Sequence, residues 1–313
     1  MSVKIVILDE VEFSDRHRER LDSLGEVTGY SEGPCGIEEV VARSADADVV
    51  IVGWTVLDGE VFRRLPRLRM ISVWATGHDS VDVGAAARHG VTIANVPAYA
   101  GRAVAELTIG LLLALTRHLV TADRSIRSGE YTWRGFEGIE LAGRTLGLVG
   151  IGDIGSEVAR LAGTFGMRVL ACARTMSGRR AGDLGVEFRP LGALLAESDV
   201  VSLHTPLSPA TRGLIGRREL AAMRAGAYLI NTARAGLVDQ RALADALCDG
   251  HLAGAALDDI HYPDDRLTSA PGVLLTPHIG FNTTEALRRK GDTCVANVAA
   301  FLGGTPTNVV NPR

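Results

Sequence analysis

The sequence predicts an α/β protein built from two doubly wound parallel sheets. Short apolar segments alternate with helix-like segments, and the alternation runs in two successive series. Wholly apolar strands between helices are typical of parallel sheets that are covered on both faces. A chain of 313 residues suits two domains of roughly 100–200 residues each.

The first series ends in a long helix. We predict this helix from about Arg102 to Ser128, with apolar residues at helical spacing in its first half. Helices are also predicted over 17–25, closed by Gly25, and over 58–66, ended by Pro66. The predicted strands of this series are "VKIVIL" (3–8), "ADVVIVG" (47–53), "LRMISVWATG" (68–77) and "VTIANV" (91–96).

The second series follows a loop that contains Tyr131, Trp133 and Phe136. A last helix, about Thr283 to Leu302, lies too far along the chain to be a further crossover of the second sheet, so we expect it to pack on the first domain. The six predicted strands are "TLGLVG" (145–150), "RVLACA" (168–173), "DVVSLH" (199–204), "AYLINTA" (227–233), "GAALDD" (254–259) and "VLLTPH" (273–278).

Composition argues against several classes of function. The net charge of −4 gives no electrostatic reason to expect nucleic acid or an anionic membrane as a partner. The four cysteines are far apart and form no CxxC pair, so neither a disulfide framework nor a metal site is expected. The start "MSVKIVILDE" is typical of a first strand rather than a signal peptide, and the apolar run 107–115 is shorter than the ~20 residues that span a bilayer. We therefore expect a cytoplasmic protein.

A glycine-rich turn predicts a dinucleotide site. Gly150, Gly152 and Gly155 have GxGxxG spacing after an apolar strand, and they open a helix predicted from Ile154 to Phe165. The three glycines would allow the tight turn, the approach of the pyrophosphate and the packing of helix on sheet. The free N–H groups at the helix start, near Asp153 and Ile154, would bind the anion.

The residues after the next strand favour a phosphorylated cofactor. An acidic residue at the end of that strand would bind the ribose hydroxyls of NAD, but the chain has Ala173 there, followed by Arg174 and Thr175. A guanidinium can pair with a 2′-phosphate through charge-assisted bonds. We therefore predict NADP(H), with NAD(H) as the alternative; Arg179 and Arg180 would add positive field or lie on the solvated surface.

Two further strand ends carry candidate catalytic side chains. Arg234 follows the strand 227–233, and His278 follows the strand that begins at Val273. Ligands of open α/β sheets bind beyond the carboxyl ends of the strands. An arginine there can hold a carboxylate and polarise a carbonyl, and a histidine can exchange the proton that accompanies hydride transfer.

The ordered set of motifs resembles the D-isomer-specific 2-hydroxyacid dehydrogenases. This family includes glycerate, hydroxypyruvate, phosphoglycerate, phosphite and formate dehydrogenases. The resemblance implies two Rossmann-like or flavodoxin-like domains: a substrate-binding domain of residues 1–98 and 287–313, and an inserted NAD(P)-binding domain of residues 99–286. It also implies a homodimer with the region near 102–140 in the interface. The motifs are "ATGHDSVD", "VAELTIGLLLAL", "GRTLGLVGIGDIG", "DVVSLHTPLSPATRGLI", "NTARAGLVD", "GAALD" and "LLTPHIG".

Site roles follow from the resemblance position by position. Arg234 would bind the substrate carboxylate and carbonyl, and His278 would be the acid/base. Backbone N–H groups of Ala75, Thr76 and Gly77 would cradle the carboxylate. Apart from the resemblance, we expect Trp54, Trp74 and His78 as pocket walls from their positions near the strand ends of the first domain. The remaining cofactor contacts would come from Thr108, His204, Thr205, Pro206, Thr211, Thr232, Ala233, Asp258 and Gly280.

The chain departs from the family pattern at one catalytic position. At the end of the strand predicted over 254–259, family members read A-L-D-V-F-E-P, and the glutamate pairs with the catalytic histidine. In this chain the position of that glutamate is occupied by His261. A carboxylate would keep the histidine protonated for ketone reduction, whereas a neutral imidazole could only accept a hydrogen bond and orient the ring. Asp259, Asp264 or Asp265 could replace the glutamate from nearby. Formate dehydrogenases use an amide two residues further on, where this chain has Pro263.

The leading hypothesis is therefore an NADP-preferring reductase of a small 2-oxo acid, of the hydroxypyruvate reductase kind, with Arg234, His278 and His261 as catalytic residues. The lost glutamate also favours a dinucleotide-sensing, corepressor-like protein with little turnover. A third reading is oxidation of an unusual substrate such as a phosphonate analogue. Motifs do not distinguish among substrates, because loops form the pocket walls.

Overall fold

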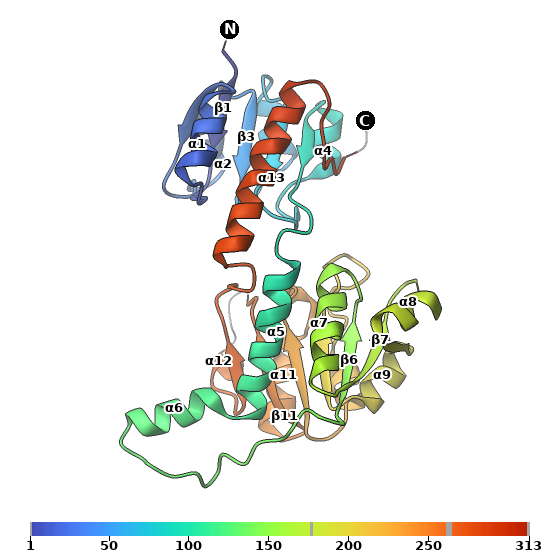
Figure 1. Cartoon of the computed structure of the whole chain (residues 1–313). Helices are drawn as coiled ribbons and strands as arrows, with labels where there is room; N and C mark the ends of the chain where they lie inside the picture. The colour runs from blue at the N-terminus through green and yellow to red at the C-terminus, as the bar shows by residue number, and fades with distance from the viewer. Residues whose placement is uncertain (1, 176–177, 261–264, 312–313) are drawn as a thin grey trace. The chain divides into compact units, whose positions relative to one another are not determined.

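The structure, a computed structural model, describes residues 2–175, 178–260 and 265–311 of the chain. The chain forms two compact units. One comprises Met1–Tyr99 and Thr283–Arg313, and the other comprises Ala100–Asn282, so the second unit is an insertion in the first. Figure 1 shows the course of the chain through both units.

The first unit contains a five-stranded parallel sheet in the order β2-β1-β3-β4-β5. The strands are β1 (Lys4–Ile7), β2 (Glu26–Gly29), β3 (Val49–Val52), β4 (Met70–Val73) and β5 (Thr92–Ala94). This strand order is that of flavodoxin-like sheets, whose winding reverses between the first and third strands. The carboxyl ends of β1 and β3 therefore flank a topological switch point, where ligands of such sheets bind.

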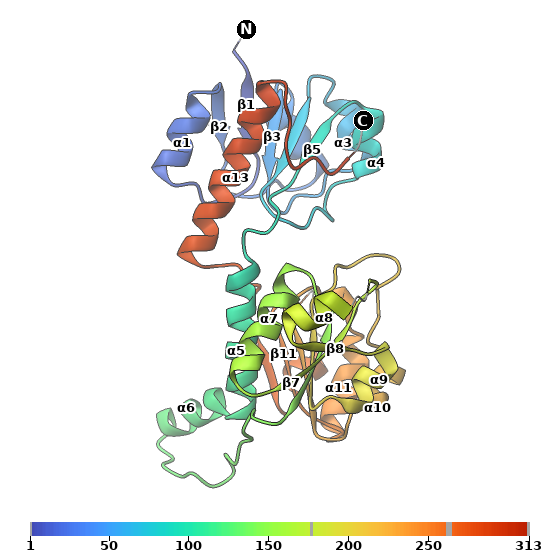
Figure 2. The same cartoon turned by 45° about the vertical axis from the view of Figure 1, so that its right-hand side comes forward.

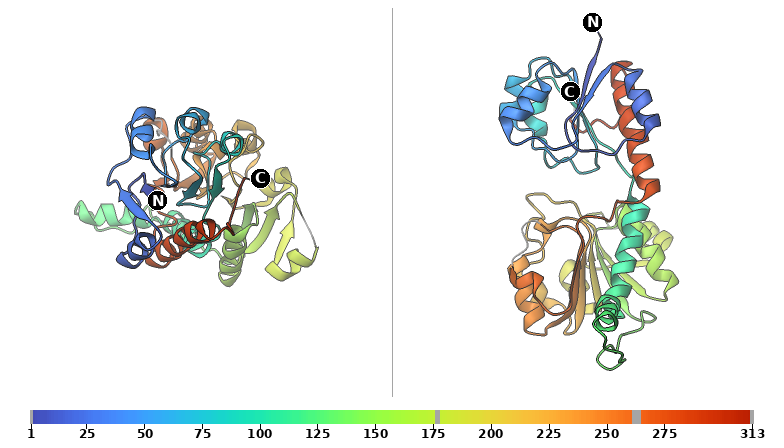
Figure 3. Two further views of the ribbon diagram at one scale, coloured as in Figure 1. Left: turned by 90° about the horizontal axis from the view of Figure 1, so that it is seen from above. Right: turned by 90° about the vertical axis from the view of Figure 1, so that its left-hand side faces the viewer.

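Helices cover both faces of this sheet (Figure 3). Helix α13 (Thr284–Leu302) returns from the end of the inserted unit and packs beside α1 (Asp15–Asp22), and the Ser72 hydroxyl of β4 lies 3.2 Å from the Cys294 thiol of α13. The last helix thus packs on the first domain, as the sequence predicted. The remaining helices of the unit are α2 (Ile37–Ser44), α3 (Gly59–Arg64) and α4 (Val83–Arg88).

The second unit contains a seven-stranded parallel sheet in the order β12-β11-β10-β9-β6-β7-β8. Its winding reverses between β6 and β9, as in dinucleotide-binding folds. The strands are β6 (Thr145–Val149), β7 (Arg168–Cys172), β8 (Val186–Phe188), β9 (Val200–Leu203), β10 (Ala227–Asn231), β11 (Leu252–Leu257) and β12 (Val273–Leu275).

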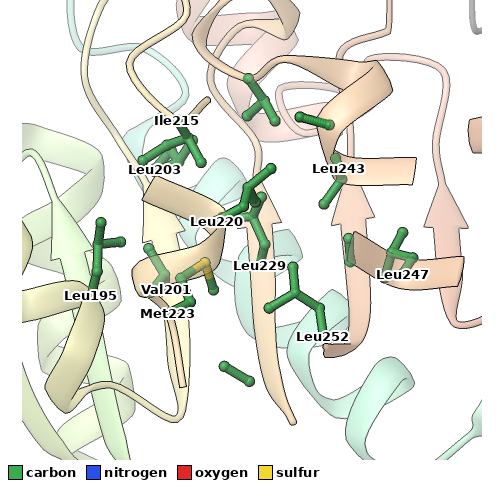
Figure 4. Close-up of a cluster of buried hydrophobic side chains, with 14 of the residues drawn as sticks. Leu195, Val201, Leu203, Ile215, Leu220, Met223, Leu229, Leu243, Leu247 and Leu252 are labelled. Carbon is green, nitrogen blue, oxygen red and sulfur yellow. The ribbon is translucent and has the colours of Figure 1, made fainter. Parts of the chain in front are cut away.

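Two hydrophobic cores cover the two faces of this sheet. Helices α5 (Gly101–Thr116) and α7 (Asp153–Thr164) pack on one face, with α8 (Gly178–Leu184) at its edge. On the other face, Val201, Leu229 and Leu252 of the strands meet side chains such as Leu220 and Leu243 (Figure 4). Leu220 and Leu243 belong to the helices that cover this face, which are α9 (Leu191–Glu197), α10 (Arg217–Ala222), α11 (Gln240–Cys248) and α12 (Asp265–Thr268).

The prediction of one long helix from Arg102 to Ser128 is wrong in one respect, because two separate helices cover this range. The chain forms α5 and then α6 (Leu119–Arg127), with His118 in the left-handed region at φ 54° between them. The N–H of Ile139 donates to the carbonyl of Thr116 at 3.1 Å, so the next loop takes an acceptor that a continuing helix would use. Figure 2 shows the change of direction.

In the described part of the chain no single helix is long and apolar enough to cross a membrane. Helices α5 and α6 meet that condition only as a pair, which is bent by 59°.

The sequence analysis does not predict strands β2 and β8. Both are short, lie at a sheet edge and contain exposed polar residues, so they lack the apolar run that marks a central strand.

Candidate active site

The glycine turn lies at the switch point of the seven-stranded sheet. Gly150 follows β6 with φ 102°, a conformation that favours glycine. A Cβ on Gly150 would lie 2.4 Å from the carbonyl oxygen of His204, which follows β9. The N–H of His204 also donates to the Val149 carbonyl at 2.8 Å. Gly150 is therefore required by the close approach of the two strand ends.

Gly152 and Gly155 are required for different reasons. A Cβ on Gly155 would lie 2.3 Å from the Gly150 carbonyl oxygen, so only glycine lets α7 start this close to the turn. A Cβ on Gly152 would meet no protein atom within 4 Å. Nothing in the folded chain demands a glycine at 152, yet it caps α7, where Asp153 and Ile154 begin the helix. Open space beside free N–H groups fits a bound pyrophosphate.

The end of β7 presents the predicted phosphate-binding residues. Arg174 and Thr175 are both exposed, directly after Ala173 and β7. No carboxylate stands at the strand end. The described chain thus offers a guanidinium and a hydroxyl to solvent at the position where the adenosine ribose lies in this fold class.

The loop after β9 is held by its own hydroxyls. Thr211 donates to the Pro206 carbonyl at 2.7 Å and accepts from the Ser208 N–H at 2.8 Å. Thr211 thereby closes the loop that contains Thr205 and Pro206. The His204 ring lies 2.9 Å from the Ser202 hydroxyl, and burial lowers the pKa of His204 to about 4, so this imidazole is neutral at physiological pH.

Helix α5 reaches the end of β10 through a pair of buried hydroxyls. Thr108 and Thr232 lie 2.9 Å apart, and Thr108 also donates to the carbonyl of Val104 at 2.8 Å. The structure therefore brings together two residues that were predicted to contact the cofactor and are 124 positions apart in the chain.

Asn231, which the sequence reading did not single out, shapes the turn that carries Arg234. Its amide donates to the Arg234 carbonyl at 2.8 Å and its carbonyl accepts from the Ala233 N–H at 3.0 Å. The Arg234 guanidinium itself donates to the Ala233 carbonyl at 2.9 Å. An asparagine at the end of an apolar strand is the sequence signal that could have identified Asn231 as a residue that shapes this turn.

Asp258 is hydrogen-bonded to the loop that carries His278. Its buried carboxylate accepts from the N–H of Ile279 at 2.9 Å, from the N–H of Gly280 at 2.7 Å and from the Thr276 hydroxyl at 2.6 Å. A Cβ on Gly280 would lie 2.7 Å from this carboxylate, so Gly280 is needed for these hydrogen bonds. The contact of Asp258 with the cofactor stays a prediction.

His278 has a carboxylate partner in Asp259. The residue adopts φ 57°, a left-handed conformation that is uncommon outside glycine and occurs at active sites. Its Nδ1 lies 3.4 Å from Oδ1 of Asp259, which is 7% exposed, while Oδ2 of Asp259 accepts from the Ala235 N–H at 2.9 Å. One carboxylate thus contacts His278 and the residue after Arg234. His261, the predicted partner, lies outside the described residues.

The predicted substrate residues of the first unit lie after β3 and β4. The Trp54 ring is half exposed. Among the described residues, the N–H groups of Ala75, Thr76 and Gly77 donate to no protein acceptor, whereas the Thr76 hydroxyl donates to the Val96 carbonyl at 2.6 Å. A row of N–H groups without protein acceptors fits a carboxylate ligand.

The chain was compared with known proteins. The family described as "D-isomer specific 2-hydroxyacid dehydrogenase, NAD binding domain" matches residues 109–280. A glyoxylate reductase of Pyrococcus furiosus is 39% identical over 286 residues, 88% of this chain and 85% of the relative. A hydroxypyruvate reductase of Blautia hydrogenotrophica is 34% identical over 322 residues, 99% of this chain and 100% of the relative.

Two solved structures are similar over nearly all of both chains. An acyclic imino acid reductase in complex with NADPH and D-Arg has a TM-score of 0.92 at 29% identity, covering 98% of this chain and 100% of that one. A D-lactate dehydrogenase of Aquifex aeolicus, complexed with NAD and lactic acid, has a TM-score of 0.89 at 28% identity and covers 99% of both chains. The similar structures thus include a cofactor with the 2′-phosphate and one without it.

The two helix-start glycines give a matched pair of variants. We expect Gly152→Ala to keep the free energy of unfolding and to weaken NAD(P)H binding at least about tenfold, because only a ligand approaches that position. Gly155→Ala should cost about 1–3 kcal/mol of stability, because its Cβ meets backbone. Urea unfolding and NAD(P)H titration measure both effects. Wild-type affinity in Gly152→Ala would contradict the assignment of the turn.

The low pKa of His204 predicts a loss of stability in acid. Between pH 6.5 and 4 the unfolded chain binds a proton at His204 that the folded chain does not, since burial lowers its folded pKa to about 4. Stability should therefore fall with pH across this window, by about 2 kcal/mol at pH 4.5 from this residue. Urea unfolding of wild type and His204→Gln at pH 7 and 4.5 measures it. Equal losses in both proteins would show that His204 is not responsible.

Proposed function

Because the chain belongs to the family of D-isomer-specific 2-hydroxyacid dehydrogenases, we propose that it reduces a small 2-oxo acid to the D-2-hydroxy acid with NADPH. The family carries NAD(P)-dependent oxidoreductase activity on small 2-hydroxy acids. The names of the relatives, glyoxylate reductase and hydroxypyruvate reductase, support the reductive direction and a 2-oxo acid substrate. The observation that carries the proposal is the left-handed His278 beside the buried Asp259.

Each catalytic side chain has a defined task in this proposal. The guanidinium of Arg234 binds the substrate carboxylate and polarises the carbonyl, and in the first unit the N–H groups of 75–77 are donors for a carboxylate. The imidazolium of His278 gives its proton to the carbonyl oxygen as the alcohol forms. When bound, the nicotinamide ring supplies the hydride. In oxidation His278 takes the proton back.

We assign to Asp259 the role that a glutamate performs in relatives. A negative charge 3.4 Å from the ring stabilises the imidazolium, and the second oxygen of Asp259 fixes the segment that carries Arg234. The carboxylate comes two residues earlier in the chain than the family position, which is occupied by His261. His261 as a catalytic residue stays a prediction that the same experiment tests.

The proposal predicts turnover that depends on His278 and Asp259. Wild type should oxidise NADPH with at least one acid of a panel of glyoxylate, hydroxypyruvate, pyruvate and phenylpyruvate. His278→Asn, which tolerates a left-handed conformation, should lose about 10²–10⁴-fold in kcat. In Asp259→Asn the ring of His278 loses the carboxylate that contacts it at 3.4 Å, so kcat for reduction should fall by about tenfold or more.

The matched control for this series is His261→Gln. If Asp259 is the partner of His278, kcat of His261→Gln should stay within about threefold of wild type. A large loss of kcat in His261→Gln and none in Asp259→Asn would reverse the assignment. Tight NADPH binding without turnover of any 2-oxo acid would instead support a dinucleotide-sensing protein.

We further propose that Arg174 selects NADPH. Its exposed guanidinium at the end of β7 supports this, as does the absence of an acid at position 173. A lost charge-assisted pair with a 2′-phosphate is worth about 1.5–3 kcal/mol. Arg174→Ala should therefore raise KM for NADPH at least about tenfold and leave KM for NADH nearly unchanged. Arg179→Ala is the control, and steady-state kinetics with both cofactors decides; equal effects on both cofactors would exclude phosphate recognition.

We also propose that the protein is a homodimer that associates through α6 and the loop 128–140. In this region Leu119, Ile126, Tyr131 and Trp133 are exposed, with Trp133 at 75%. Large apolar side chains that are exposed within one segment of the chain are typical of an interface. Sedimentation equilibrium should give twice the 33.1 kDa chain mass, and Ile126→Glu should shift the protein toward monomer. A monomeric wild type would refute the proposal.

A further inference from the structure

A lysine ammonium is buried among aromatic rings in the first unit. The Nζ atom of Lys290, on α13, lies 3.4 Å from the centroid of the Trp74 ring, 5.1 Å from that of Tyr99 and 5.5 Å from that of Trp54. Lys290 is 0% exposed. Burial disfavours the charged form and lowers the pKa of Lys290 to about 7, while the negative ring faces attract the ammonium.

A buried carboxylate holds the backbone beside the same rings. Asp9, which follows β1 and is 2% exposed, accepts from the N–H groups of Gly53 at 2.6 Å, Trp54 at 2.8 Å and Thr55 at 3.2 Å. The Thr55 hydroxyl donates to its other oxygen. This grip lies between the ends of β1 and β3, at the switch point of the sheet. The carboxylate therefore fixes the backbone of 53–55 at the place where a ligand of this sheet binds.

The rings are positioned by an edge-to-face contact and by the ammonium on their faces. Trp74 meets Phe13 edge to face at 6.2 Å, and its buried Nε1 has no hydrogen-bond partner among the described residues. No hydrogen bond therefore sets the orientation of this indole, and Lys290 is the charged group on its face. Trp74 immediately precedes the N–H groups of 75–77. The Trp54 ring also contacts the Lys290 ammonium, but 52% of the surface of Trp54 is exposed.

We propose that Lys290 and Asp9 are positioning residues that fix Trp54 as the specificity-determining wall of the substrate site. Asp9 holds the loop by its backbone, and Lys290 holds the indoles by their faces. The exposed face of Trp54 then favours 2-oxo acids that carry a flat apolar group on C3, with the carboxylate on the N–H groups of 75–77. This inference rests on the proposed function, because it names the substrate class of that site.

A double-mutant cycle tests the proposal. The readout is the ratio of kcat/KM for phenylpyruvate to that for glyoxylate, which has no C3 group. Lys290→Met keeps an unbranched side chain among the rings and removes the charge, so it should lower the ratio at least about tenfold through KM, with kcat for glyoxylate within about threefold. Lys290→Arg should recover part of the ratio. Trp54→Leu should lower it as much, and the double variant no further.

The cycle has clear opposing outcomes. A wild-type ratio in Lys290→Met, or additive effects in the double variant, would overturn the role of Lys290. An equal loss of kcat for both acids would do the same, since it marks general damage to the site. Asp9→Asn, which keeps the size of the side chain and weakens its hold on the three N–H groups, should lower the ratio in the same direction. A wild-type ratio in that variant would remove Asp9 from the proposal.

A second measurement does not depend on activity. In a Trp133→Phe background Trp54 and Trp74 are the only tryptophans, so selectively excited tryptophan emission reports on the ammonium. Emission should change with a midpoint near pH 7, as expected for Lys290, and the change should vanish when Lys290→Met is added. The proposal would be overturned if the emission transition persisted after Lys290→Met is added, or if it were absent from the Trp133→Phe protein that keeps Lys290. The other charged or titratable groups around this cluster are Asp9, Glu12, His17, Arg20, Arg289, Asp292 and Cys294.

The two proposals fail in distinguishable ways. If wild type turns over no 2-oxo acid, the proposed function fails while the fluorescence of the tryptophans still reports whether Lys290 holds them. If wild type is active and the Lys290→Met ratio is unchanged, the proposed function stands and the specificity role falls.

Discussion

Two adjacent buried carboxylates at the end of β11 hold the candidate site of the second unit together. Successive residues of an extended segment point in opposite directions, so Asp258 and Asp259 serve different partners. Asp258 binds the backbone of the loop 276–280. Asp259 contacts the His278 ring and the N–H of Ala235. Residues from the ends of three neighbouring strands are thereby fixed to one another.

Buried charge is costly unless donors or π faces surround it, and the chain meets that condition differently in its two units. In the second unit, backbone N–H groups surround Asp258, which a glycine at 280 makes accessible. In the first unit, Asp9 uses the same device on the loop 53–55, whereas Lys290 relies on indole and phenol rings. In each unit these charges lie beside the residues to which we assign substrate contacts, where misplacement by a fraction of an ångström affects rate most.

The two sheets share one winding principle with different strand orders, and this explains where each set of residues lies. Parallel strands present their carboxyl ends at one edge, and reversal of the winding opens a gap there. In the second unit that gap lies between β6 and β9, beside Gly150 and His204. In the first it lies between β1 and β3, beside Asp9 and Trp54.

The sequence by itself determined the α/β class, the apolar central strands, the glycine turn and the strand-end positions of Arg234 and His278. These features are local, because apolar runs and glycine spacing depend on neighbouring residues alone. Only the tertiary structure decided that Asp259 reaches His278, 19 positions along the chain, and that Asp9 reaches Trp54, 45 positions along it. It also decided the break at His118 and the two short edge strands. Those features depend on which distant segment supplies a donor, an acceptor or a neighbouring strand, and no local pattern of residues carries that information.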